Sequence, residues 1–171
     1  MLGPDGTPHD GGPASSIPEA SGSYESSESS AGPIPILLAE DNAADVFLIR
    51  EAFREHSLNV DLQVVEDGEA AISYIDRADS DSAMQAPAAI LLDLNLPRMD
   101  GRQVLSHIRH SVRCALVPVI VISSSSSPYD RENASLLGAT EFFTKPLNYA
   151  EFLGIGKLVK DLLNQSKSAQ K

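Results

Sequence analysis

Between residues 34 and 165, short runs of apolar residues alternate with longer segments in which apolar and polar positions are mixed. The runs have the length of strands and few polar positions, as is typical of strands covered on both faces of a sheet. We predict five strands, over residues 34–39, 60–66, 88–93, 117–123 and 141–144. The fourth, VPVIVIS, is the richest in the β-branched residues that strands favour.

A helix is predicted after each strand. In residues 42–56, Val46, Ile49 and Phe53 fall on one helical face, and Asn42 is placed to cap the helix. The other helices are predicted over residues 68–78, 101–111, 129–138 and 148–165. The last contains two glycines, each costing about 1 kcal/mol relative to alanine in a helix interior, so we expect it to be kinked or to begin later.

This fivefold strand–helix alternation predicts one α/β domain over residues 34–165. Right-handed crossovers place helices on both faces of a parallel sheet. We therefore expect a flavodoxin-like, doubly wound sheet of five strands in the order 2-1-3-4-5.

The segment before the first strand differs in composition from the rest of the chain. Residues 1–33 are rich in Gly, Pro, Ser and Glu, contain no Lys or Arg, and show no periodic apolar pattern. Such a segment buries too little apolar surface to offset its ordering entropy, so we expect an acidic, disordered tail that is inert or docks a partner. A short second tail is expected over residues 166–171.

Charge, cysteine content and hydropathy exclude several classes of protein. The formal net charge is −11, and residues 1–33 hold five acids and no base, which leaves −6 for the remainder. Such a domain repels phosphate backbones, so no nucleic-acid partner is expected. The single cysteine, Cys114, excludes an internal disulfide and fits a reducing compartment. We find no signal peptide and no apolar run of the roughly 20 residues that span a bilayer, so we expect a cytoplasmic protein without a membrane partner.

Acidic residues follow two of the predicted strands at the point where each strand ends. Glu40 and Asp41 come directly after the first strand, and Asp93 ends the third. In the order 2-1-3-4-5 these two strands are neighbours at the switch point, where ligands bind beyond the carboxyl ends of the sheet. We therefore expect the three carboxylates to converge at the ligand site of the fold.

Three converging carboxylates repel one another, because two unit charges about 4 Å apart cost roughly 4 kcal/mol at an effective dielectric constant of 20. The cluster needs a cation or a shared proton, and hard oxygen ligands with access to water suit Mg²⁺. The fourth strand ends in the hydroxyl of Ser123, and the fifth leads to the ammonium of Lys145 at the same edge. A metal, a hydroxyl and an ammonium around one carboxylate are what phosphoryl transfer needs.

Taken together, these pieces resemble the receiver domain of two-component response regulators. The matched motifs, in chain order, are Glu40-Asp41, Asp93 within DLNLPRMDG, Ser123 and Lys145-Pro146. The resemblance covers essentially all of residues 34–165. It implies a stand-alone response regulator that a sensor histidine kinase phosphorylates in a two-component phosphorelay, with output through protein contacts.

The resemblance also implies a role for each matched residue. Asp93 would be the phosphoacceptor, while Ser123 and Lys145 would contact the phosphoryl oxygens. The ligands of Mg²⁺ would be Glu40, Asp41, Asp93 and the backbone carbonyl of Asn95. Beyond self-directed phosphotransfer and autodephosphorylation, no enzyme activity is expected.

Some positions narrow the resemblance and others depart from it. The stretches AEDNAADVFLIREAF and FFTKPLN are most similar to the single-domain regulators that partner bacterial phytochrome kinases. Glu40 stands where Asp is commoner. Phe142 stands where many members carry a Tyr that turns inward on activation, so a switch built from Ser123 and Phe142 would work by packing, without a phenol hydrogen bond.

The fifth strand and last helix carry more apolar residues than one helix face needs. The family often dimerises through its fourth helix, fifth strand and fifth helix, so part of this surplus would form a homodimer surface. A wide stripe buried against the sheet explains the surplus nearly as well.

Three rival interpretations stay open. A Mg²⁺-dependent phosphatase would use Asp93 as nucleophile, but such hydrolases place a second acid two residues later, where this chain has Asn95. A flavin module of the same topology would bind a phosphate that Glu40 and Asp41 repel. A degenerate receiver that only dimerises would not need the intact set of acids.

Overall fold

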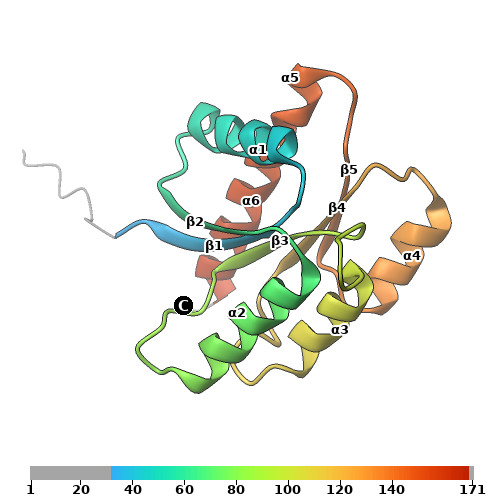
Figure 1. Ribbon diagram of the computed structural model, residues 1–171. Helices are drawn as coiled ribbons and strands as arrows, with labels where there is room; N and C mark the ends of the chain where they lie inside the picture. The colour runs from blue at the N-terminus through green and yellow to red at the C-terminus, as the bar shows by residue number, and fades with distance from the viewer. Residues whose placement is uncertain (1–31, 170–171) are drawn as a thin grey trace, which may run out of the picture. The chain divides into compact units, whose positions relative to one another are not determined.

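Five parallel strands form one sheet in the order β2-β1-β3-β4-β5, so the predicted flavodoxin-like topology is confirmed (Figure 1). The strands are β1 (Ile34–Ala39), β2 (Val60–Val65), β3 (Ala89–Asp93), β4 (Val119–Ser123) and β5 (Glu141–Thr144). This computed structural model describes residues 32–169. The expected acidic tail therefore lies almost entirely outside the described residues.

Helices cover both faces of the sheet. They are α1 (Ala43–Glu55), α2 (Gly68–Ser80), α3 (Gly101–His110), α4 (Pro128–Leu136), α5 (Tyr149–Phe152) and α6 (Gly154–Ala169). Helices α1, α5 and α6 lie on one face, and α2, α3 and α4 on the other (Figure 1). None of the helices described between residues 32 and 169 is long and apolar enough to cross a membrane.

The alternation of side chains along β3 explains why its sequence has almost no polar position. Ile90 and Leu92 belong to the hydrophobic cluster beneath α2 and α3, whereas Ala89 and Leu91 belong to the cluster beneath α1 and α6. Successive side chains of a strand point to opposite faces, so a strand covered on both sides is apolar throughout.

Polar caps start the helices at the edge where the strands end. Asn42 caps α1 as predicted, because its side chain accepts a hydrogen bond from the N–H of Ala44. Asp100 caps α3 in the same way through the N–H of Arg102. These caps stop the helical backbone short of the strands, which leaves the ends of β1 and β3 free to present side chains.

The last helix is broken, as its two glycines led us to expect. The predicted helix of residues 148–165 is two helices, α5 and α6, and α6 continues past residue 165 to Ala169. A Cβ atom on Gly156 would lie 2.4 Å from the carbonyl oxygen of Ala52 on α1, so only glycine fits where α1 and α6 meet. The same atom on Gly154 would meet nothing within 4 Å.

Most apolar residues of the last helix pack against the sheet. Phe152, Ile155, Val159, Leu162 and Leu163 are all buried in the cluster beneath α1 and α6. Large apolar side chains are exposed on α4 instead, at Tyr129 and Leu136. The wide buried stripe therefore accounts for the apolar surplus of the last helix.

Candidate functional site

The register of β1 and β3 brings two of the predicted acids side by side. Ala39 pairs with Leu92, so the next residues along the two strands, Glu40 and Asp93, are neighbours at the carboxyl edge of the sheet. Both acids are buried, with 1% of Glu40 and 4% of Asp93 exposed.

The register of β4 and β5 adds the hydroxyl and the lysine. Ser123 pairs with Thr144, and the backbone N–H of Lys145 donates to the carbonyl oxygen of Ser123 over 2.8 Å. Lys145 therefore leaves the sheet at the level where Ser123 ends β4. Its side chain then reaches across to the ends of β1 and β3.

Three carboxylates form a cluster that suits a divalent cation. Glu40, Asp41 and Asp93 each place one oxygen within 4.8 Å of the others. Asp41 is exposed while the other two are buried, so a cation held here keeps access to water. All donors are hard oxygens, and partial hydration with carboxylate ligands is the coordination that Mg²⁺ prefers. The residues present thus fit the expected metal.

Lys145 connects the carboxylates of the site through hydrogen bonds. Its Nζ donates to Asp93 Oδ2 at 2.6 Å and to Glu40 Oε2 at 2.8 Å. A third bond, of 2.7 Å, goes to Asp45 Oδ2 on the first turn of α1. Only 12% of the lysine side chain is exposed, so these charge-assisted bonds are poorly screened by solvent.

The site holds more negative charge than Lys145 alone neutralises. Burial, with a smaller contribution from the charge of Asp93, raises the pKa of Glu40 to about 7, although the hydrogen bond and charge of Lys145 oppose the shift. Burial lowers the pKa of Lys145, but its bonds to Asp45, Asp93 and Glu40 outweigh burial and hold that pKa above its ordinary value. Near neutral pH the cluster therefore favours either a proton on Glu40 or a bound cation.

The backbone fixes the carboxylate of Asp93 from the other side. Its Oδ1 accepts a hydrogen bond of 2.8 Å from the N–H of Asn95. Helix α3 starts close behind, because a Cβ atom on Gly101 would lie 2.2 Å from the backbone oxygen of Asp93. Glycine is thus needed there for the close approach of α3 to the end of β3.

Ser123 ends β4, and a second set of charges holds the loop that follows it. Its hydroxyl oxygen accepts a hydrogen bond of 3.1 Å from the N–H of Ser125. The hydroxyl of Ser125 donates to Asp130 at 2.6 Å, and Arg102 donates to the same carboxylate at 2.6 Å. The loop between β4 and α4 is therefore tied both to α4 and to α3.

Phe142 lies away from the acids, toward α4. The guanidinium carbon of Arg131 stands 4.8 Å from the centroid of the phenyl ring. Arg131 also donates a long hydrogen bond of 3.4 Å to the carbonyl oxygen of Phe142. The ring is partly buried and packs against the cluster beneath α2 and α3.

The structure thus joins Glu40, Asp41, Asp93 and Lys145 directly, with Ser123 on the next strand. Sequence reasoning did not predict the bond of Asp45 to Lys145, nor the hydrogen bonds of Arg102 and Ser125 to Asp130. The sequence gives one weak indication that Asp45 belongs to the site, because it lies one helical turn after Glu40 and Asp41. An acid in a first helical turn is common for dipole reasons, however, and so does not stand out.

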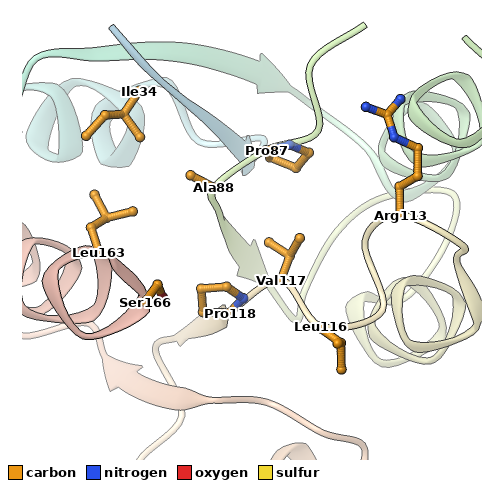
Figure 2. A pocket seen from close by; sticks show the side chains of 9 residues that line it. All are labelled: Ile34, Pro87, Ala88, Arg113, Leu116, Val117, Pro118, Leu163 and Ser166. Carbon is orange, nitrogen blue, oxygen red and sulfur yellow. The ribbon is translucent and has the colours of Figure 1, made fainter. Parts of the chain in front are cut away.

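A hollow of about 330 Å³ lies at the opposite edge of the sheet. Figure 2 shows it lined by Ile34 at the start of β1, by Ala88 and Pro118 directly before β3 and β4, and by Leu163 of α6. At its rim, the guanidinium of Arg113 donates hydrogen bonds to the carbonyl oxygens of Ala78, Asp81 and Met84. The hollow is thus separate from the acid cluster and has no part in its chemistry.

Comparison with known proteins identifies the family. The model of the response regulator receiver domain matches residues 36–155, so the chain belongs to this family of two-component signalling proteins. Members of the family are phosphoacceptor switches.

Several relatives resemble the chain over most of their own length. The probable methanogenesis regulatory protein FilR2 of Methanothrix harundinacea is 36% identical over 70% of this chain and 76% of its own. Response regulator Rcp1 of Synechocystis is 34% identical over 71% of this chain and 83% of its own. The crystal structure of Mn²⁺-bound Rcp1 superposes with a TM-score of 0.67 at 30% identity, covering 75% of this chain and 92% of that one.

A third relative is the phosphorylated cyanobacterial phytochrome response regulator RcpA. Its crystal structure superposes with a TM-score of 0.70 at 32% identity, covering 79% of this chain and 96% of that one. The similarity to phytochrome-associated regulators that the sequence indicated is therefore confirmed.

Proposed function

We propose that this protein is a signalling switch whose Asp93 accepts a phosphoryl group from a sensor histidine kinase. The observation that carries the proposal is the environment of this buried carboxylate. One of its oxygens bonds Lys145, and it lies in a cluster with Glu40 and Asp41. The geometry suits a carboxylate that gains negative charge next to fixed positive charge.

In the proposed transfer, an oxygen of Asp93 attacks the phosphorus of a phosphohistidine. The P–N bond of the donor breaks as the new P–O bond forms, and the imidazole leaves with the electron pair. Lys145 and the hydroxyl of Ser123 would donate hydrogen bonds to the phosphoryl oxygens. Mg²⁺, held by Glu40, Asp41, Asp93 and the backbone carbonyl of Asn95, would supply positive charge that neutralises those oxygens.

We further propose that phosphorylation is read out through Ser123 and Phe142. The phosphoryl group carries a charge of about −1.5 to −2, and we expect Ser123 to move toward it to donate a hydrogen bond. That movement pulls on the loop that Ser125 ties to Asp130. Because Arg131 is the next residue of α4 and holds the ring of Phe142, both switch residues are coupled to the first turn of α4.

The partners follow from the same arrangement. We infer that the protein is cytoplasmic and that its partner is a sensor histidine kinase, with a phytochrome-like kinase favoured by the relatives Rcp1 and RcpA. We also propose a homodimer through α4, β5 and the last helix. Tyr129 and Leu136 support it, because they are seven residues apart on one face of α4 and are 71% and 79% exposed.

Acetyl phosphate and Mg²⁺ test the proposal. We expect the intact mass to rise by one phosphoryl group, only with Mg²⁺ present, and to stay unchanged in Asp93→Asn. A folded wild-type protein that takes up no phosphoryl group from acetyl phosphate or from any histidine kinase would refute the proposal.

Donor consumption separates this function from the phosphatase. A switch consumes roughly one donor per lifetime of its acyl phosphate, whereas a hydrolase releases phosphate over many rapid turnovers. Asn95, which stands where such hydrolases carry a general acid, is exposed and has no ionisable group to offer.

A further inference from the structure

Lys145 has a third acceptor for which the proposed chemistry has no role. Glu40 and Asp93 belong to the acid cluster, whereas Asp45 lies outside it and still accepts a bond of 2.7 Å from Nζ. An ammonium group has three N–H donors, so these three carboxylates saturate it. A phosphoryl oxygen can gain a bond from Lys145 only if one of the three is given up.

The bond between Asp45 and Lys145 is not a by-product of helix capping. Asp45 lies three residues after the cap Asn42, where an acidic side chain often bonds back to the N–H of the capping residue. That N–H donates instead to Glu40 Oε1 at 3.1 Å. The carboxylate of Asp45 is only 17% exposed and turns inward to the ammonium.

The other two acceptors of Lys145, Glu40 and Asp93, are also expected to bind the cation. Lys145 bonds Glu40 Oε2 and Asp93 Oδ2, and the other oxygen of each carboxylate accepts a backbone N–H. A cation held by Glu40 and Asp93 would therefore compete for oxygens that already accept hydrogen bonds. If Lys145 had no other partner, cation binding would leave a buried ammonium with broken hydrogen bonds, which is costly. Asp45 offers the lysine a partner that the cation does not need.

We propose that Asp45 is a positioning residue for Lys145, an assignment that rests on the proposed function because it presumes the metal-assisted site. Asp45 anchors the ammonium to α1 while Glu40 and Asp93 turn to the cation. Lys145 thus stays beside Asp93 without competing for the metal ligands, and two of its N–H donors become free for phosphoryl oxygens.

A double-mutant cycle on Mg²⁺ binding tests this assignment. The dissociation constant of Mg²⁺ is measured by calorimetry on the unphosphorylated full chain for wild type, Asp45→Asn, Lys145→Met and the double variant. We expect Asp45→Asn to weaken Mg²⁺ binding, and the loss to be at least about threefold smaller when Lys145 is absent. Glu55→Gln is the matched control, since it removes one exposed charge from the same helix.

Two outcomes of the comparison between backgrounds would overturn the assignment. An equal loss in both backgrounds would mean that Asp45 acts only as a nearby charge, and no loss in either would mean that it does not act on the site. Asp45→Glu, which keeps the charge, is expected to recover most of the affinity. Thermal unfolding of each variant excludes misfolding as the cause of a loss.

The outcome is distinguishable from failure of the proposed function. If the wild type takes up no phosphoryl group yet the cycle shows coupling, the phosphoacceptor role fails and the assignment of Asp45 stands. If the wild type is phosphorylated and the cycle shows no coupling, the assignment fails alone. A wild type that binds no Mg²⁺ overturns the assignment as well.

Discussion

At the scale of single residues, the carboxylate of Asp79 near the end of α2 ties this helix to the turn after α3. It accepts hydrogen bonds from the hydroxyl of Ser111 at 2.7 Å and from the N–H groups of Arg113 and Val112 at 2.9 and 3.0 Å. Slight burial raises the pKa of Asp79, but these bonds outweigh it and hold the pKa below its ordinary value. The ionised carboxylate is therefore part of what stabilises the fold.

This shift sets the sign of a pH dependence. Because its pKa is lower in the folded protein, Asp79 contributes fully to stability above the unfolded value near 4, and the contribution is lost as pH falls through the folded value. We expect Asp79→Asn to lower the free energy of unfolding at pH 7 and to cost much less at pH 3, measured by urea unfolding. Glu132→Gln, at an exposed position on α4, serves as control. Equal losses at the two pH values would contradict the role of the ionised form.

Some residues of the site could be predicted from the sequence and others could not. Glu40, Asp41, Asp93 and Lys145 could be predicted to meet, because the ends of parallel strands share one edge of the sheet. Asp45 could not, because its role depends on where the side chain of Lys145 finishes. That endpoint is set by three-dimensional packing and by the three carboxylates that bond the ammonium group.

At the scale of elements, two glycines of the last helix have opposite meanings. Gly156 lies where α6 crosses α1, and a Cβ atom there would meet the backbone oxygen of Ala52 and the ring of His56. Gly154 is the first residue of α6, and a Cβ atom there would meet nothing within 4 Å. The low helix propensity of glycine indicates a kink or a later start near these residues, but it cannot tell which glycine is required for packing.

The paired substitutions separate the two roles. We expect Gly156→Ala to lower the free energy of unfolding by about 1–3 kcal/mol, because α1 and α6 must move apart to admit a methyl group. Gly154→Ala should change it by no more than about 1 kcal/mol, and in the stabilising direction, because it only restricts the unfolded chain. Chemical denaturation measures both. The same loss in the two variants would show that helix propensity, not close packing, places Gly156.

The elements themselves follow closely from the sequence. The alternation of apolar runs with helical periodicity gave the number, type and order of the strands, because each strand is buried on both faces. The predicted last helix is divided near its two glycines, as expected, since α5 ends at Phe152 and α6 begins at Gly154. Its end at Ala169 also lies past the predicted boundary, where the polar residues carry no apolar signal.

At the scale of the whole molecule, the largest question is which face meets a partner. Tyr129 and Leu136 form an exposed apolar strip on α4, on the element that the proposed switch moves. We expect the double variant Tyr129→Ser, Leu136→Ser to weaken self-association by at least about tenfold, since a few central apolar residues carry most interface energy. Sedimentation velocity with and without phosphorylation measures the effect.

A matched control lies at the other edge of the sheet. Val112 and Leu116, in the connection from α3 to β4, are also large and apolar and are even more exposed. Changing both to serine should leave self-association unaltered. A wild type that stays monomeric in both states, or equal losses in the two double variants, would contradict a dimer through α4.

The central claim is that Asp93 carries the phosphoryl group, and chemical mapping of the acyl phosphate tests it most directly. The protein is phosphorylated with acetyl phosphate and Mg²⁺, reduced with borohydride, which converts an aspartyl phosphate to homoserine, and digested for peptide sequencing by mass spectrometry. The account predicts homoserine at position 93, in a yield equal to the phosphorylated fraction. Homoserine at Asp41 or Asp45 with Asp93 intact would contradict it, because the phosphoryl group would then sit on a residue assigned to hold a cation or Lys145.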